Sequence, residues 1–134
     1  MIPLLLALAC SGSGTENCTT PEDFKKLTRV ALPGSVESFR CYSEQGIDTA
    51  ALARFVLPAS EIDSFYQGLG LGVPLKTGQN PLRPETAWPP EWWRATSSGA
   101  YRGAEGQVGN RAFKLRVEES ANSKVEVFLL SFTL

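Results

Sequence analysis

Apolar and polar residues alternate along the last third of the chain, as in Phe113, Leu115 and Val117. This period of two predicts β-strands, because successive side chains of a strand point to opposite faces of the sheet. The last segment is apolar at both odd and even positions, which is typical of a strand in the middle of a sheet. The strands expected here are 99–107, 111–118 and 124–134, joined by turns at 109–110 and 121–123.

Helical spacing appears at two places in the first half. Thr20 and Pro21 form a helix start, and apolar residues follow at helical spacing until Pro33-Gly34 ends the run. A second helix carries its apolar residues at i, i+3, i+4 and i+7, with Ser60 and Asp63 in the positions of a capping box. The apolar residues of that second helix are Ile62, Phe65, Tyr66 and Leu69, and Gly70 is its expected stop.

Two strands, 35–43 and 50–57, are expected between these helices and are predicted to pair as a hairpin. The proline-rich segment 73–98 is expected to be a long loop. The elements together predict an α+β fold, with an antiparallel sheet of about five strands and one or two helices packed on one face. A chain of 134 residues suits one domain of this kind, expected over 18–134.

The first ten residues predict where the protein is located. The apolar run 2–9 is too short to span a bilayer but fits the apolar region of an export signal, with small residues before Cys10. This stretch resembles the lipobox of bacterial lipoproteins, in which Cys10 would become the first residue and carry palmitate-like acyl chains. The resemblance implies a signal peptide at 1–9 and a lipidated cysteine with a flexible tether at 10–17. The alternatives are simple secretion, with cleavage after Ala9 and no lipid, and a buried first strand of a cytosolic domain.

Cysteine usage agrees with export. Once Cys10 is assigned to lipid, Cys18 and Cys41 remain as an even pair, and an oxidising compartment favours a disulfide between them. Two buried free thiols are the alternative, because spacing alone does not bring the sulfur atoms into contact.

The body of the chain resembles a family of small bacterial lipoproteins that have no established activity. The resemblance rests on four short motifs and covers less than half of the chain, so it supports fold and location. The motifs are Leu32-Pro33, Arg54-Phe55-Val56-Leu57-Pro58, Ile62-Asp63-Ser64-Phe65 and Pro89-Pro90-Glu91-Trp92-Trp93.

All three tryptophans lie in one proline-rich stretch, where Trp88, Trp92, Trp93 and Arg94 form the candidate binding site. Tryptophan and arginine are enriched in binding hot spots. The alternative is that the indoles cover an open sheet face or the end of the helix at 62–69, since three exposed indoles would promote aggregation.

The chain offers little catalytic chemistry. It has no histidine, no Gly-x-Ser-x-Gly and no Cys-x-x-Cys, so no catalytic residue, metal site or cofactor is assigned. The adjacent acids Glu118 and Glu119 are expected on opposite strand faces, as solvated or turn residues. A net charge of −1 without long charge runs gives no sign of nucleic-acid binding.

These features predict a lipoprotein of the cell envelope, anchored to the membrane by lipid and facing the periplasm or the exterior. Its domain is expected to bind another envelope protein or a cell-wall component. The alternatives are a small metal-independent hydrolase or transferase, and an inhibitor or immunity-type lipoprotein.

Overall fold

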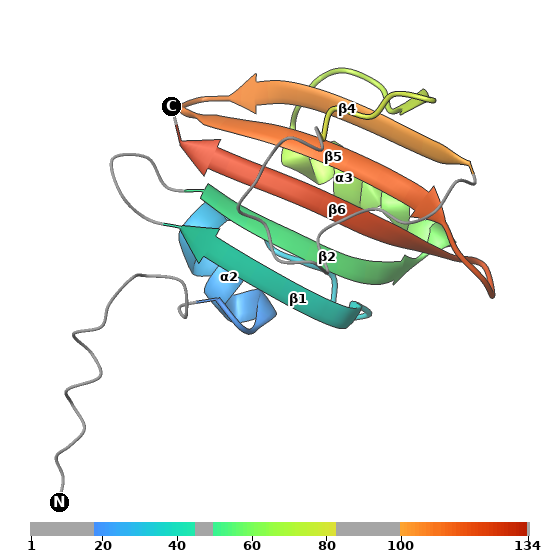
Figure 1. Ribbon diagram of the computed structural model, residues 1–134, viewed down its shortest axis with the longest axis horizontal. Coiled ribbons are helices and arrows are strands. Elements are labelled where there is room, and N and C mark those ends of the chain that lie inside the picture. The colour runs from blue at the N-terminus through green and yellow to red at the C-terminus, as the bar shows by residue number, and fades with distance from the viewer. Residues whose placement is uncertain (1–17, 45–49, 83–99, 134) are drawn as a thin grey trace, which may run out of the picture.

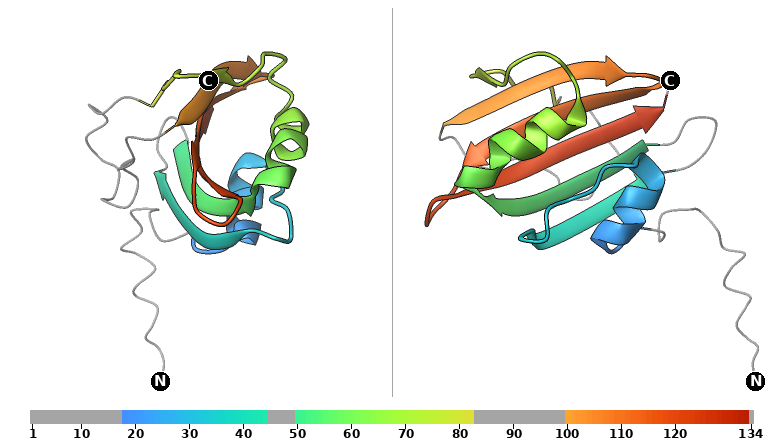
Figure 2. Two further views of the ribbon diagram at one scale, coloured as in Figure 1. Left: turned by 90° about the vertical axis from the view of Figure 1, so that its right-hand side faces the viewer. Right: turned by 180° about the vertical axis from the view of Figure 1, so that it is seen from behind.

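A computed structural model describes residues 18–44, 50–82 and 100–133. The fold is an α+β sandwich of one antiparallel sheet and two helices, which lie on the same side of the sheet (Figures 1 and 2). In sheet order the strands run β1-β2-β6-β5-β4-β3. The elements are α2 (Pro21–Thr28), β1 (Glu37–Glu44), β2 (Ala50–Pro58), the 3₁₀ turn η2 (Ala59–Glu61), α3 (Ile62–Leu69), β3 (Lys76–Thr77), β4 (Tyr101–Val108), β5 (Arg111–Glu119) and β6 (Lys124–Thr133).

The predicted fold class is confirmed, and the strand count is six where about five were expected. The additional strand is β3, a two-residue segment that pairs with β4 inside the stretch expected to be a loop. A strand this short has no periodicity to detect, so only the tertiary pairing reveals it.

The last strand, β6, lies inside the sheet, as its apolar pattern predicted. β6 pairs with β2 on one side and with β5 on the other, and β2 forms the predicted hairpin with β1. Because both neighbours of β6 are strands, each of its side chains is flanked by side chains of β2 and β5 on the same face of the sheet. Figure 1 shows β6 between these two strands.

Helix α2 begins as predicted but ends earlier than predicted. The Thr20 hydroxyl accepts from the Asp23 amide, and the Asp23 carboxylate accepts from the Thr20 amide, which completes a capping box. The helix ends at Thr28, because Arg29 adopts the left-handed conformation with φ 66°. Residues up to Pro33 are therefore a linker instead of a further helical turn.

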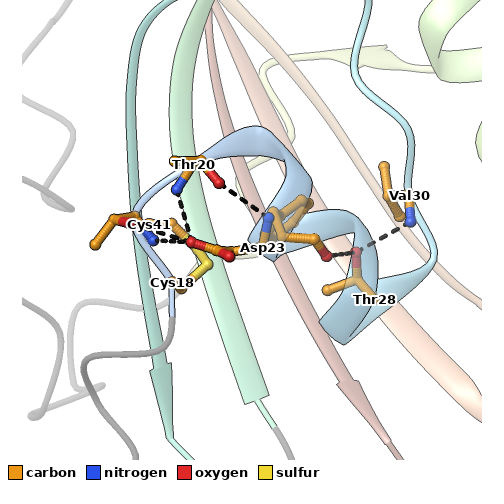
Figure 3. Close-up of a disulfide and its surroundings, with 8 residues drawn as sticks. Cys18, Thr20, Asp23, Thr28, Val30 and Cys41 are labelled. Carbon is orange, nitrogen blue, oxygen red and sulfur yellow. Dashed lines mark hydrogen bonds between the residues drawn. A yellow bond between two sulfur atoms is a disulfide. The ribbon is translucent and has the colours of Figure 1, made fainter.

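A disulfide joins the start of α2 to the sheet. Cys18 and Cys41 are bonded, with Cα atoms 5.4 Å apart, so the predicted pairing is confirmed. Figure 3 shows the bond next to the Thr20 and Asp23 cap. Closing this 23-residue separation stabilises the fold by roughly 3 kcal/mol in the chain-entropy model.

Helix α3 has a different start from the predicted one. Instead of a capping box at Ser60, the 3₁₀ turn η2 leads into the helix, and the N-cap Glu61 makes no side-chain cap hydrogen bond. Its end is as predicted, because Gly70 adopts φ 80° and its amide donates to the Gln67 carbonyl oxygen.

A row of aromatic side chains runs between the two helices across the helix-covered face of the sheet. The ring centroids of Phe24 and Phe39 are 6.2 Å apart, those of Phe39 and Phe55 6.5 Å, and those of Phe55 and Phe65 5.7 Å. These contacts run from α2 across β1 and β2 to α3. They form part of the main core, which fills the helix-covered face of the sheet.

Candidate functional site

The site residues predicted from the sequence lie outside the described residues. This holds for the binding candidates Trp88, Trp92, Trp93 and Arg94 and for the lipidation candidate Cys10. The signal peptide and the tether at 1–17 lie outside as well. No described helix is long and apolar enough to span a bilayer.

A pocket of about 1010 Å³ opens on the helix-covered face. Its walls are the linker after α2, one side of η2 and α3, and the turn between β4 and β5. Ligand sites usually enclose about 300 to 1000 Å³, so this pocket is large enough for a small organic molecule. The lining includes Arg29, Val30, Glu61, Phe65, Gly68, Leu69, Val108, Arg111 and Phe113.

The linker is held in place by the Thr28 side chain. The Thr28 hydroxyl donates to the Phe24 carbonyl oxygen at 2.7 Å and accepts from the Val30 amide at 3.1 Å. This pair of bonds satisfies buried polar groups where the helix stops, and it turns the chain so that Val30 packs inward. The wall of the pocket is therefore fixed by hydrogen bonds within the chain.

Helix α3 contributes the opposite wall. Phe65 and Leu69 are four residues apart, so they lie on one helix face, and both are 8% exposed. Gly68 also lines the pocket, and a Cβ added there would meet no atom within 4 Å. The glycine leaves room that a larger side chain would occupy.

Phe113, which lines the pocket, belongs to a row of paired residues that crosses four strands of the sheet. Ser43, Ala51, Ser131 and Phe113 are successive partners across β1, β2, β6 and β5. Three of these four side chains are small. Phe113 is the member of this row that lines the pocket, whereas Ser43, Ala51 and Ser131 are at most 1% exposed and do not line it.

A buried hydroxyl without a partner lies in that row. The Ser131 hydroxyl oxygen has no hydrogen-bond partner, and the residue is 1% exposed. It is the single side-chain atom of this kind in the described part of the chain. A buried polar group left unsatisfied costs about 1 to 3 kcal/mol. Ser43, in the same row, is fully buried but does take part in an interaction.

The charged groups of the pocket do not balance. Arg29 and Arg111 line it, and neither forms an ion pair with any described residue. Glu61 is the one acidic lining residue, and its carboxylate accepts from the Ser35 hydroxyl at 2.5 Å. Two guanidinium groups thus face one engaged carboxylate, which gives the pocket a positive rim.

The opposite face of the sheet contains two arginine–glutamate ion pairs. Arg116 binds Glu118 at 2.6 Å, with both side chains at most 6% exposed, and Arg54 binds Glu126 at 2.6 Å. The register places Phe128 between the two arginines, and the Arg54 guanidinium lies 4.8 Å from its ring centroid. These charges are satisfied by one another.

The predicted acid pair does not converge. Glu118 is 2% exposed and paired with Arg116, so its expected solvation is wrong. Glu119 is exposed, and as its neighbour in β5 it points to the other face, as predicted. The two carboxylates therefore cannot act on one substrate atom.

Two tyrosines are perturbed by their surroundings. Burial raises the pKa of Tyr66, whose hydroxyl donates to the Val73 carbonyl oxygen at 2.5 Å beside a second, smaller pocket of about 560 Å³. Burial and, to a lesser degree, the Glu44 carboxylate raise the pKa of Tyr42 on the opposite face. Both hydroxyls remain protonated at neutral pH.

No group of three or more potential metal ligands occurs among the described residues. Comparison of the chain with protein-family models, with curated proteins and with solved structures finds no match. Sequence reasoning missed Arg29 and Arg111, because a lone arginine in a linker or at a strand start is indistinguishable from a surface residue.

Proposed function

We propose that the chain is a lipid-anchored protein of the cell envelope whose folded domain is a binding module. The ligand site is the pocket between the linker after α2 and helix α3. The observation that supports this site most strongly is its combination of about 1010 Å³ with a lining that is apolar in one part and charged in another.

The interior of the pocket is suited to apolar groups. Val30, Phe65, Leu69 and Phe113 line it while being at most 8% exposed, and Val108 at its edge is 38% exposed. Val108 is one of two large apolar side chains left exposed in the described residues. A ligand that covers Val108 and fills the pocket removes apolar surface from water at about 25 cal/mol per Å².

The anchor follows from Cys10 and the apolar run before it. Two acyl chains hold a protein stably at a membrane, and the short tether keeps the domain close to the bilayer. A binding module in this place would take its ligand from the envelope. Mass spectrometry of the mature protein tests the anchor, which predicts a diacylglycerol thioether at Cys10 and no residue before it.

Titration with N-phenyl-1-naphthylamine, a neutral probe that fluoresces in apolar surroundings, tests the pocket. The full chain carries Cys10→Ser so that no acyl chain of its own competes. Gly68→Trp places an indole in the pocket and is expected to weaken probe binding at least tenfold. The substitution is compatible with the backbone, since Gly68 is helical and has open space at its Cβ.

Gln67→Trp is the matched control. Gln67 is the preceding residue of α3, is exposed, and does not line the pocket. Its variant is expected to bind the probe as the parent does. Equal binding by the parent and both variants, or no binding by the parent, would show that the pocket is not the site.

A further inference from the structure

The rim of the pocket contains two arginines that form no ion pair with any described residue. Arg54, Arg102 and Arg116 each pair with a carboxylate. Arg29 and Arg111 do not, although both are placed at the same pocket by different elements. The arginines that lack an acidic partner at this pocket are therefore the groups for which a ligand would supply the counter-charge.

Arg29 occupies a backbone position that disfavours it. Its φ of 66° is the left-handed conformation that glycine adopts most readily at a helix end. A residue with a Cβ is disfavoured there, because the Cβ lies too close to the following carbonyl oxygen. Interaction with the α2 dipole offsets part of this cost, because a cation is favourable at a helix C-terminus. The exposed guanidinium remains available at the pocket.

Arg111 reaches the same pocket from the sheet. It is the first residue of β5 and lies two residues before Phe113, so both side chains project from the helix-covered face. Arg111 is half-buried, and its strand partner in β6 is the uncharged Thr133. Its charge is consequently close to the apolar interior and has no acidic neighbour across the sheet.

We infer that the pocket binds an amphiphile with one anionic head group and an apolar chain. This inference rests on the proposed function of the pocket and adds the chemical class of the ligand. Arg29 and Arg111 bind the head group, and the chain lies over Phe65, Leu69 and Phe113. A guanidinium presents a planar fork of donors that matches carboxylate and phosphate oxygens, which is why these anions are the complementary heads.

The charge balance favours an anion over the other heads. A cationic head would face two guanidinium groups and a single carboxylate, that of Glu61. A neutral head would leave both arginines without a counter-charge. Hydrogen bonds to charged groups contribute about 1.5 to 3 kcal/mol, so an anionic head should bind at least tenfold more tightly than a neutral one.

Displacement of the bound N-phenyl-1-naphthylamine from the full chain with Cys10→Ser tests the inference. The competitors share a twelve-carbon chain and are used below their micelle-forming concentrations: dodecanoate, dodecyl phosphate, dodecanol and dodecyltrimethylammonium. Dodecanoate or dodecyl phosphate should displace the probe at concentrations at least tenfold lower than dodecanol. The better of the two anions distinguishes a fatty-acid head from a lipid phosphate. Added salt should weaken the anions and leave dodecanol unchanged.

Two variants assign the effect to the arginines. Arg29→Gly removes the guanidinium and suits the backbone conformation, so the protein folds at least as well. Arg111→Met keeps an unbranched apolar stem. Each variant should lose most of the preference for anions while binding the probe and dodecanol as before. Arg40→Met, on the exposed edge of the opposite face, is the control and should change nothing.

The outcomes separate the two proposals. If the probe binds and Gly68→Trp blocks it, but dodecanoate, dodecyl phosphate and dodecanol compete equally, the anionic head is wrong and the pocket stands. Anion binding that survives in both arginine variants would also overturn the inference. If the parent does not bind the probe at all, the proposed function fails and the inference fails with it.

Discussion

The two faces of the sheet bury different kinds of side chain. On the helix-covered face, alternate residues of the strands are apolar and pack against α2 and α3. On the opposite face, Leu52 and Phe128 are fully buried next to arginine–glutamate pairs. The difference shows that a strand buried on both faces need not be apolar on both.

The polar groups of the two faces differ in their partners. On the opposite face Arg116 and Glu118 satisfy each other, and the Arg116 guanidinium also lies 3.8 Å from the Tyr101 ring centroid. On the helix-covered face, the Ser131 hydroxyl has no hydrogen-bond partner among the described residues. The pocket residues Arg29 and Arg111 form no ion pair with a described residue. The opposite face, with its paired charges, is suited to stability, and the helix-covered face, with its pocket, is suited to a ligand.

The largest effect on stability is expected from a substitution on the opposite face of the sheet. Glu118→Ala removes the carboxylate that pairs with the buried Arg116 guanidinium, which lowers the free energy of unfolding by about 3 to 5 kcal/mol. Glu37→Ala is the control, because it breaks the exposed pair with Lys124 and should cost at most about 1 kcal/mol. Urea unfolding measures both. Equal losses in the two variants would contradict the distinction between a structural and a surface ion pair.

An intermediate effect is expected from two buried serines of the helix-covered face. Ser43 and Ser131 flank Ala51 in the sheet and are at most 1% exposed. Ser131→Ala removes an unsatisfied hydroxyl and should raise the free energy of unfolding by about 1 kcal/mol, whereas Ser43→Ala loses an interaction and should lower it by a similar amount. Thermal unfolding of both variants gives the comparison. A loss in both would show that the Ser131 hydroxyl is satisfied in solution.

The smallest effect is the response to alkaline pH. Folding raises the pKa of Tyr42 on one face and of Tyr66 near the other, chiefly through burial. The stabilisation is fully present below the unfolded pKa near 10 and is lost as the pH rises through the folded pKa. Urea unfolding of the Cys10→Ser chain at pH 8 to 11 should show stability falling, with a shallower fall in Tyr42→Phe and in Tyr66→Phe. An unchanged slope in both variants would assign the fall to other groups.

The sequence predicted what depends on local pattern. Alternation in β5 gave its buried face correctly, and the apolar residues at both odd and even positions of β6 gave its place inside the sheet. The spacing of Phe65 and Leu69 gave the buried side of α3. Gly70 as a helix stop and the Cys18–Cys41 bond were also correct. Each of these features depends on residues near one another or on the count of one residue type.

Features that depend on tertiary packing were missed or misjudged. The period of two places Arg116 and Glu118 on one face, but nothing local shows that both are buried there. The capping box at Ser60 failed because η2 inserts a 3₁₀ turn before α3. The pocket required the linker after α2, α3 and the β4–β5 turn to meet, and these segments are far apart in sequence.

The central claim is that ligand binds on the helix-covered face, and intermolecular NOEs test it most directly. Isotope-labelled full chain with Cys10→Ser is titrated with dodecanoate, and contacts from its methylene protons are assigned. The account predicts NOEs to the rings of Phe65 and Phe113, which line the pocket. NOEs to Phe128 and Leu52 of the opposite face, or none to the protein at all, would contradict it.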